Sequence, residues 1–308
     1  DVASELLFGN GLVVDTADGA SDAWEFDEVR IGNSWASVTP AAAVPSVFSR
    51  ESFKGYAGGD LAGQLYRGTG FAPGGSWSGT GGASFALPTL KHAIGWPIAG
   101  KAALAGNGID LLASLDTAAG GPFGQARLID FATGMVGGGN VDGVLFVGFL
   151  ARAEYPAGAA TEDTPNDGAS SALQLKRGTY EVQTLGGNSW NDWAYSLFGA
   201  SGEVALRDSY GAGAYLTYNT STRLFVAKIT FHAYANDDLT VWMDPTRADG
   251  DSQGASVFMY SAAGVGDLSF NAYALRSGND PADNGWDFDE VRFAPTFDGA
   301  LPPATPEY

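Results

Sequence analysis

The feature that most constrains this chain is a seven-residue stretch that occurs twice. WEFDEVR spans 24–30 and WDFDEVR spans 286–292, 262 positions apart. Other pairs that match at the same offset are Leu6 and Leu268, Phe8 and Phe270, Asp18 and Asp280, and Ala20 and Ala282. A match this long without an insertion is an internal repeat, and a repeat has to be identified before a fold is assigned.

The offset predicts how the chain is divided into domains. A spacing of 262 residues is about the size of one large β domain, which is typical of tandem units. We therefore expect 1–40 to be the last two strands of a preceding unit and 41–46 to be an Ala/Pro connector. We expect 47–302 to be a complete domain that ends with the second copy, followed by a Pro-rich tail at 303–308.

Apolar runs bounded by Gly, Asn, Asp or Pro predict strands throughout the body. The predicted strands are 141–152, 203–208, 214–219, 223–234, 238–244 and 255–261. Within 223–234, alternation places Phe225, Ala227, Ile229, Phe231 and Ala233 on one apolar face, as in a strand that covers a core. Residues 108–116 are the one candidate for a helical turn or two. This pattern predicts an all-β, antiparallel two-sheet β-sandwich or jelly roll.

Charge and composition exclude several kinds of partner. The formal net charge is −19, which opposes binding to nucleic-acid phosphates and to anionic membrane surfaces. The chain has no Cys, so disulfides and thiolate chemistry are excluded. No apolar run reaches the roughly 18 residues of a membrane span, and we expect no membrane insertion. A start in mid-pattern favours a piece processed from a longer precursor.

The closing stretch Phe-Asp-Glu-Val-Arg, followed by a Pro, resembles the last strand of laminin G-like, concanavalin A-like β-sandwich domains. The resemblance is to the kind repeated in exported proteins of planctomycetes and verrucomicrobia. ESFKGYAGGDLAGQ (51–64), RLFVAKITF (223–231) and DLTVWMDPT (238–246) fit it in order, and it covers most of 48–297. It implies two curved sheets, adjacent first and last strands, and an extracellular or cell-surface bacterial protein. It does not fix the function, because this sandwich serves lectins, glycanases and structural modules.

The carboxylates of the repeat are the first candidates for catalysis. Glycanases of this fold place three acids on one strand, at alternating positions or with one residue inserted, where they face the sugar. Here Asp287 and Asp289 alternate, but Val291 follows on the face expected for a third acid, and Val29 stands at that place in the first copy. We therefore predict no catalytic residue. Instead of a catalytic strand, we expect a closing strand in which Glu290 and Arg292, with Asp289, pair structurally or bind turn amides.

Calcium is the one cofactor that the sequence suggests. Asp and Asn gather in 161–168, 235–238, 249–252 and 277–285, and oxygen donors on short loops are the ligands of Ca²⁺. The same residue types also stabilise turns by binding their own backbone, so the two interpretations stay open. The candidate ligands are Asp237, Asp238, Asp280 and Asp283.

A sugar site is suggested by NSWNDW at 188–193. Aromatic rings stack on sugar faces while amides and carboxylates bind hydroxyls. The alternative is that the two Trp side chains cover a sheet edge. The candidate glycan-binding residues are Asn188, Trp190, Asn191, Asp192 and Trp193.

The spare copy raises the question of which sheet it joins. An isolated strand pair is marginally stable and its edges tend to pair with another sheet. It could extend its own body, form a small extra domain, or complete a sandwich in a neighbouring chain. The candidate assembly residues are Leu6, Phe8, Trp24, Phe26, Val29, Ile31, Trp286, Phe288 and Val291.

The leading hypothesis is a non-catalytic extracellular structural or adhesive module that associates with itself head-to-tail, as a filament or surface layer. The alternative is a carbohydrate-binding, lectin-type module with a polysaccharide partner. A glycoside hydrolase comes third.

Overall fold

The computed structural model of the protein describes a large part of the chain in two units. The described residues are 6–8, 12–14, 46–79, 81–87, 90–91, 100–105, 109–154, 170–178, 180–187, 193–198, 204–206, 222–253, 258–278 and 285–303. Contacts divide the chain into Asp1–Ala43 and Val44–Tyr308. The division falls within the connector that the sequence places at 41–46.

The first unit contains a short antiparallel hairpin. Its strands are β1 (Leu6–Phe8) and β2 (Leu12–Val14), and Leu6 lies opposite Val14. The intervening sequence is Gly-Asn-Gly, a composition typical of hairpin connections. The rest of the first copy, with the candidate residues Trp24, Phe26, Val29 and Ile31, lies outside the described residues.

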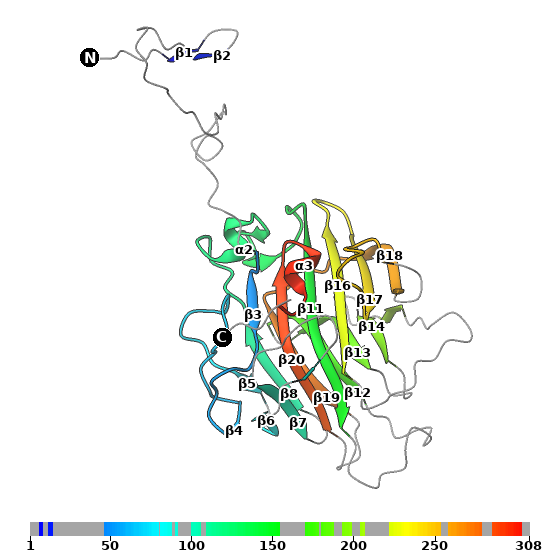
Figure 1. Cartoon of the computed structure of the whole chain (residues 1–308). Coiled ribbons are helices and arrows are strands. Elements are labelled where there is room, and N and C mark those ends of the chain that lie inside the picture. Colours follow the sequence, from blue (N-terminus) through cyan, green and yellow to red (C-terminus); the bar gives the residue numbers. More distant parts are fainter. Residues whose placement is uncertain are drawn as a thin grey trace. The chain divides into compact units, whose positions relative to one another are not determined.

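The second unit is built on two antiparallel sheets (Figure 1). The larger sheet runs in the order β18-β17-β16-β11-β20-β7-β6-β4, and β3 also pairs with β20. Its strands are β3 (Ser49–Glu51), β4 (Gly59–Asp60), β6 (Ala83–Ala86), β7 (Lys101–Ala105), β11 (Gly143–Glu154), β16 (Arg223–Phe231), β17 (Asp237–Met243), β18 (Phe258–Gly266) and β20 (Gly285–Ala294).

The smaller sheet of this unit runs in the order β15-β14-β13-β12-β19-β8-β5. Its strands are β5 (Ser78–Gly79), β8 (Ile109–Ser114), β12 (Ser170–Arg177), β13 (Tyr180–Gly187), β14 (Trp193–Phe198), β15 (Val204–Leu206) and β19 (Ala272–Gly278). A separate pair is formed by β9 (Ile129–Asp130) and β10 (Met135–Val136). The described helices, α2 (Pro122–Gln125) and α3 (Phe297–Ala300), are single turns.

The all-β, antiparallel two-sheet sandwich predicted from the sequence is confirmed. The first strand of the body, β3, pairs with the last, β20, with Glu51 opposite Val291. The prediction of helical turns at 108–116 is wrong, because Ile109–Ser114 forms β8 against β19. Buried Ile109, Leu111 and Ala113 alternate with more exposed residues, which is the period of two that a strand requires.

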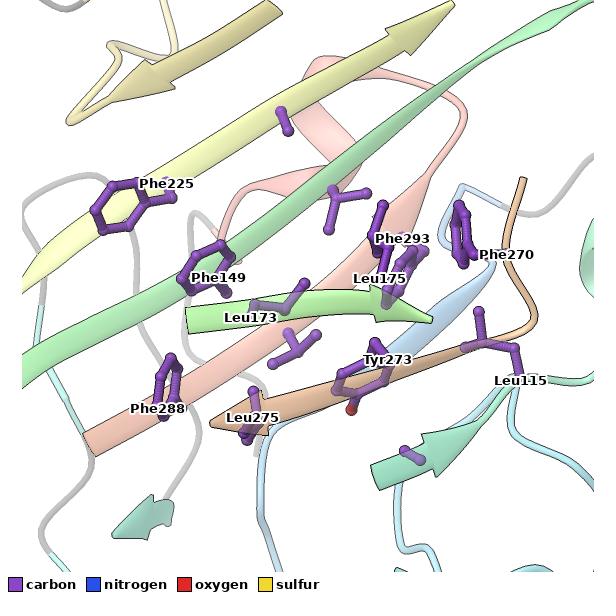
Figure 2. Close-up of a cluster of buried hydrophobic side chains, with 14 of the residues drawn as sticks. Leu115, Phe149, Leu173, Leu175, Phe225, Phe270, Tyr273, Leu275, Phe288 and Phe293 are labelled. Atoms are coloured by element: carbon purple, nitrogen blue, oxygen red, sulfur yellow. The ribbon is translucent and has the colours of Figure 1, made fainter. Parts of the chain in front are cut away.

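The main core lies between the two sheets. Phe149 of β11 and Phe225 of β16 stack with ring centroids 5.1 Å apart. Figure 2 shows side chains of β12 and β19 facing those of β20, among them Leu173, Leu175, Tyr273, Leu275, Phe288 and Phe293. The apolar face predicted for 223–234 is confirmed within β16, since Phe225, Ala227, Ile229 and Phe231 all belong to this core, whereas Ala233 lies beyond the end of the strand.

A second apolar cluster covers the outer face of the larger sheet. Leu224 and Val226, the other face of β16, pack there with Trp242 and with Phe297 of α3. The helix lies very close to β11, because a Cβ added at Gly148 would be 1.9 Å from the Ala300 carbonyl oxygen. A glycine is therefore required at this crossing, and both faces of the central strands are covered.

Among the described residues, no helix is long and apolar enough to span a membrane.

Candidate functional site

The second copy of the repeat, β20, lies in the interior of the larger sheet. One edge pairs with β11, while the other pairs with β7 at 285–288 and with β3 at 291–293. The register with β11 shifts so that Asp289 faces Leu150 and Arg292 faces Gly148, which leaves Glu290 and Val291 opposite one residue. This is a β-bulge, and Glu290 adopts the left-handed conformation with φ of 50°.

The bulge changes which side chains share a face. Strict alternation predicts Val291 on the face of Asp287 and Asp289, and this prediction is wrong. Val291 is buried in the core with Trp286 and Phe288, because the extra residue shifts the alternation by one position. The next outward position after Asp289 falls to Arg292, and the Glu290 carboxylate ion-pairs with that arginine.

The carboxylates of β20 are held by cations and amides. Asp287 Oδ2 accepts from Lys101 Nζ at 2.6 Å and from Arg152 Nη2 at 2.7 Å, and the Lys101 and Asp287 side chains are almost fully buried. Glu290 Oε2 accepts from Arg292 Nε at 2.9 Å. The backbone amides of Glu290 and Leu90 donate to the two oxygens of Asp289. These contacts join β7, β11 and β20, and they are the structural pairing expected for a closing strand.

A further buried carboxylate, Glu51, lies at the end of β3 beside the bulge. Its Oε1 accepts from the Phe53 amide at 2.7 Å, and its Oε2 accepts from the Tyr56 hydroxyl at 2.6 Å and the Gly68 amide at 3.2 Å. Trp77 Nε1 donates to the Tyr56 oxygen at 2.9 Å. Burial raises the pKa of Glu51 to about 7, against the opposing effect of the three donors.

Sequence reasoning missed this network. The sequence signal for this network is an acid among aromatic residues, because Glu51 stands between them in FSRESFKGY. Glu51, Tyr56 and Trp77 are all 5% exposed or less. The network therefore acts inside the fold, where it attaches Phe53, Tyr56 and Gly68 of the following chain to β3.

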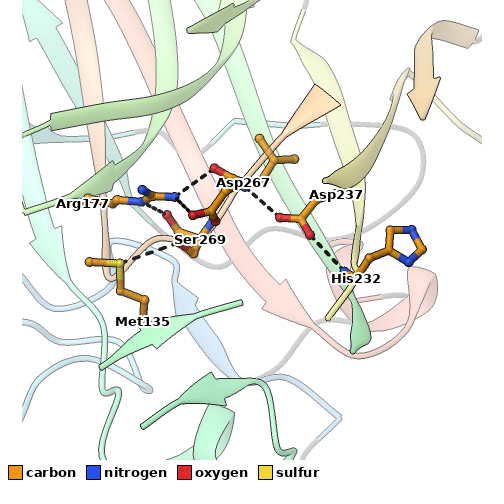
Figure 3. A network of polar contacts seen from close by, with 7 residues as sticks. Met135, Arg177, His232, Asp237, Asp267 and Ser269 are labelled. Carbon is orange, nitrogen blue, oxygen red and sulfur yellow. Dashed lines mark hydrogen bonds and ion pairs between the residues drawn. The ribbon is translucent and has the colours of Figure 1, made fainter. Parts of the chain in front are cut away.

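The candidate calcium ligands Asp237 and Asp238 lie together at the start of β17. Asp237 Oδ1 accepts from the His232 amide at 3.0 Å and its Oδ2 from the Leu268 amide at 2.7 Å (Figure 3). Asp238 Oδ1 accepts from the Gly264 amide at 2.8 Å, and its Oδ2 lies 2.9 Å from His232 Nε2. The four oxygens thus contact protein donors, which is the turn-stabilising role of these residue types.

The contacts at this turn also shift the pKa values of its ionisable residues. The hydrogen bond with Asp238 raises the pKa of His232, and the hydrogen bond from His232 lowers the pKa of Asp238. Burial raises the pKa of Asp237. Within the described ranges, no group of three or more His, Asp or Glu side chains is arranged to hold a metal. Asp280 and Asp283 lie outside these ranges, and calcium binding stays a prediction.

The turn between β16 and β17 is tied to the chain that leads into β11. The Ala233 amide donates to Asp142 Oδ1 and the Tyr234 amide donates to the Gly139 carbonyl, each at 2.7 Å. Tyr234 has φ of 61° and its side chain is 86% exposed. Sequence reasoning missed Tyr234 as well. Its signal is an aromatic residue at the head of the turn sequence YANDD, where Gly or Asn is usual.

On the far side of this region, Arg177 at the end of β12 binds Asp267, with Nη2 2.6 Å from the carboxylate (Figure 3). The sugar site predicted from the sequence lies elsewhere. Asn188, Trp190, Asn191 and Asp192 are outside the described residues, and Trp193 begins β14, paired with Gly187. Gly187 in turn pairs with Ser171 near the start of β12, so the length of β12 separates the two regions.

Comparison with known proteins gives no family. No family model matches the chain, and no curated protein matches it. Among solved structures, the receptor-binding domain of botulinum neurotoxin type G is similar with a TM-score of 0.45 and 9% identity over 81% of this chain. That of type D gives a TM-score of 0.44 and 9% identity over 81% of this chain. This chain spans 48% and 49% of those two chains.

An endo-β-1,4-glucuronan lyase from Trichoderma reesei is similar with a TM-score of 0.36 and 10% identity, over 80% of this chain and 97% of that chain. All three TM-scores are below 0.5, so no inference about this protein is drawn from these similarities.

Proposed function

We propose that this chain is a non-catalytic structural or adhesive module of an extracellular or cell-surface bacterial protein, with a sandwich of the laminin G-like kind. The observation that carries the proposal is the engagement of the β20 acids. A glycosidase needs an acid and a second carboxylate free to face the sugar. Asp287 instead binds Lys101 and Arg152, and Glu290 binds Arg292.

Burial of the second copy limits which residues could mediate association with other copies of the chain. Trp286, Phe288 and Val291 are at most 2% exposed, because the second copy closes its own sandwich. These three side chains would reach a neighbour only if β20 left its sheet. The first copy carries equivalent apolar residues in the separate unit Asp1–Ala43. We therefore assign self-association to the first copy, acting head-to-tail on a neighbouring chain.

Light scattering after size-exclusion chromatography, together with electron microscopy, tests this assignment. The full chain should form assemblies that grow with protein concentration, and deletion of residues 1–43 should leave a folded monomer. Phe26→Asp is the matched point variant, because it disrupts the apolar side of the first copy without shortening the chain. A full chain that stays monomeric at every concentration would refute self-association and leave the non-catalytic assignment intact.

A second candidate function is carbohydrate binding. The composition of 188–193 supports it, with two Trp beside Asn and Asp at a hairpin between β13 and β14. Retention on a panel of polysaccharides, lost in Trp190→Ala and Trp193→Ala but not in Phe26→Asp, would support it. Retention that survives both Trp substitutions would refute this location of the site.

Calcium is proposed for the 277–285 segment, with Asp280 and Asp283 as ligands. A ligand that binds the folded state raises the unfolding temperature as its concentration increases. We expect CaCl₂ to raise the unfolding temperature over EDTA, and Asp280→Asn with Asp283→Asn to abolish the rise. MgCl₂ is the matched control, and an equal rise in the double variant would refute this site.

A further inference from the structure

Tyr234 combines two unusual properties. Five non-glycine residues in the described part of the chain have positive φ, namely Phe53, Arg127, Tyr234, Asp244 and Glu290. Phe53 is fully buried, while Asp244 and Glu290 make ion pairs with arginines. Tyr234 is the one aromatic among them whose ring is exposed, at 86%. Packing of its ring therefore does not explain why an L-residue is kept in the left-handed conformation.

The backbone of Tyr234 is nevertheless firmly placed. Its amide donates to the Gly139 carbonyl, and the preceding amide, of Ala233, donates to Asp142. The far side of the turn is fixed by Asn236 Nδ2, which donates to the Gly264 carbonyl. The turn thus presents an unpacked ring on a rigid support, and such an outlier points to a function rather than to the fold.

A second aromatic side chain is exposed at the same end of the molecule. Phe131, in the turn between β9 and β10, is 63% exposed. The β9–β10 pair leads directly into 138–142, because Ile129 bridges Gly137 and Asp130 lies against Gly138. Phe131 and Tyr234 are the exposed aromatic residues among the described side chains. Phe131 directly follows β9, which contacts Gly137 and Gly138, and the Tyr234 amide donates to the Gly139 carbonyl.

The polar groups around Tyr234 favour a sugar over an apolar partner. Asp142, Asn236 and the His232–Asp238 pair surround the turn, and each is at least partly exposed. A pyranose presents an apolar face that stacks on an aromatic ring and a rim of hydroxyls that such groups can bind. Carboxylates of Asp142, Asp238 and Asp267 and the net charge of −19 oppose acidic polymers.

We propose that the β16–β17 turn is a binding site for a neutral polysaccharide, with Tyr234 as the stacking ring and Phe131 as a second aromatic contact. This inference rests on the carbohydrate-binding candidate described above, but it places the contact at the other end of β12 from Trp193, the first residue of β14. The two locations can therefore be separated by substitution.

The test is depletion of the full chain from solution by cellulose, curdlan, mannan and xylan, with polygalacturonate as the anionic control. We expect at least one neutral polymer to bind the natural chain. Tyr234→Gly should weaken that binding about tenfold or more, which corresponds to the loss of one central contact. Tyr234→Phe should keep it within about threefold, and Phe131→Ala should weaken it by less than Tyr234→Gly does. Trp190→Ala and Trp193→Ala should leave it unchanged.

Urea unfolding of Tyr234→Gly provides the second readout. Because glycine adopts positive φ without strain, the unfolding midpoint should stay equal or rise while binding falls. A lower midpoint would mean that the ring supports the fold, and would overturn the proposal. Binding lost in the Trp variants but kept in Tyr234→Gly would overturn this site and retain the carbohydrate candidate. Binding to polygalacturonate alone, or to none of the polymers, would overturn this proposal, and the latter would overturn the carbohydrate candidate too.

Discussion

The two copies of the repeat share the stretch WEFDEVR/WDFDEVR, but the described residues that precede it make different pairings. In the first copy, Leu6–Phe8 pairs with Leu12–Val14 as a hairpin. In the second copy, the equivalent residues 268–270 and 274–276 do not pair with each other. Residues 274–276 instead join β8 and β12, while Phe270 bridges Val136.

The difference shows that a local sequence pattern does not determine which strands pair with each other. Alternating apolar residues favour a strand in either copy, but the backbone donors and acceptors need partners that the pattern does not name. In Val44–Tyr308 the rest of the sandwich supplies these partners, whereas β1 and β2 pair with each other. The two copies can therefore be compared by substituting equivalent residues.

The largest expected effect is loss of an aromatic ring from the core. Phe288→Ala should lower the free energy of unfolding by about 3–5 kcal/mol, because the ring is fully buried and packs against Phe149. The equivalent Phe26→Ala should change the unfolding of the body by less than about 0.5 kcal/mol. Urea unfolding followed by Trp fluorescence measures both. An equal loss in Phe26→Ala would mean that the first copy is part of a sandwich core.

The next effect concerns the buried ion pair. Asp287→Ala should cost about 3 kcal/mol, because it leaves Lys101 buried without its closest carboxylate. The equivalent change in the first copy, Glu25→Ala, should leave the unfolding of the body unchanged. Replacing both partners, in Lys101→Met with Asp287→Leu, should recover part of the loss. A double variant no more stable than Asp287→Ala would contradict the ion-pair explanation.

The third prediction concerns β3, the strand that borders the second copy. Burial raises the pKa of Glu51 from 4.5 to about 7. Between pH 4.5 and pH 7 the folded state therefore keeps this carboxyl protonated, whereas the unfolded chain has lost the proton. The contribution of Glu51 to stability is present at low pH and is lost as the pH rises through about 7. Relative to Glu51→Gln, the natural chain should lose about 1.4 kcal/mol per pH unit from pH 4.5 to 7.

Urea unfolding of the natural chain and Glu51→Gln at half-unit pH intervals measures this difference. A difference that is flat or grows with pH would show that the three hydrogen-bond donors keep Glu51 ionised.

The smallest effect tests the bulge. Glu290→Ala and Glu290→Gly both remove the contacts with Arg292 and Arg50, but only Gly relieves the left-handed conformation. Glu290→Gly should therefore be more stable than Glu290→Ala by about 1 kcal/mol, the reverse of the usual order in strands. The same pair of substitutions at Glu28 should show no difference in the unfolding of the body. An Ala variant as stable as the Gly variant would show that the bulge does not strain the backbone.

Some of the site was predictable and some was not. The pairing of Glu290 with Arg292 followed from residue types at short spacing. The bulge did not, because it depends on the register that β11 imposes on β20. The exposure of Tyr234 could not be predicted, because it depends on whether other segments cover the turn, and no local spacing reveals this.

The sequence by itself determined the fold class and the faces of the long strands. Period-two alternation in 223–231 is a local property, and it correctly placed Phe225 and Phe231 in the core. Tertiary structure alone decided which strands pair, where Glu290 interrupts the alternation, and what surrounds Glu51 and Tyr234. Each of these depends on contacts between residues far apart in the chain, which no local pattern specifies.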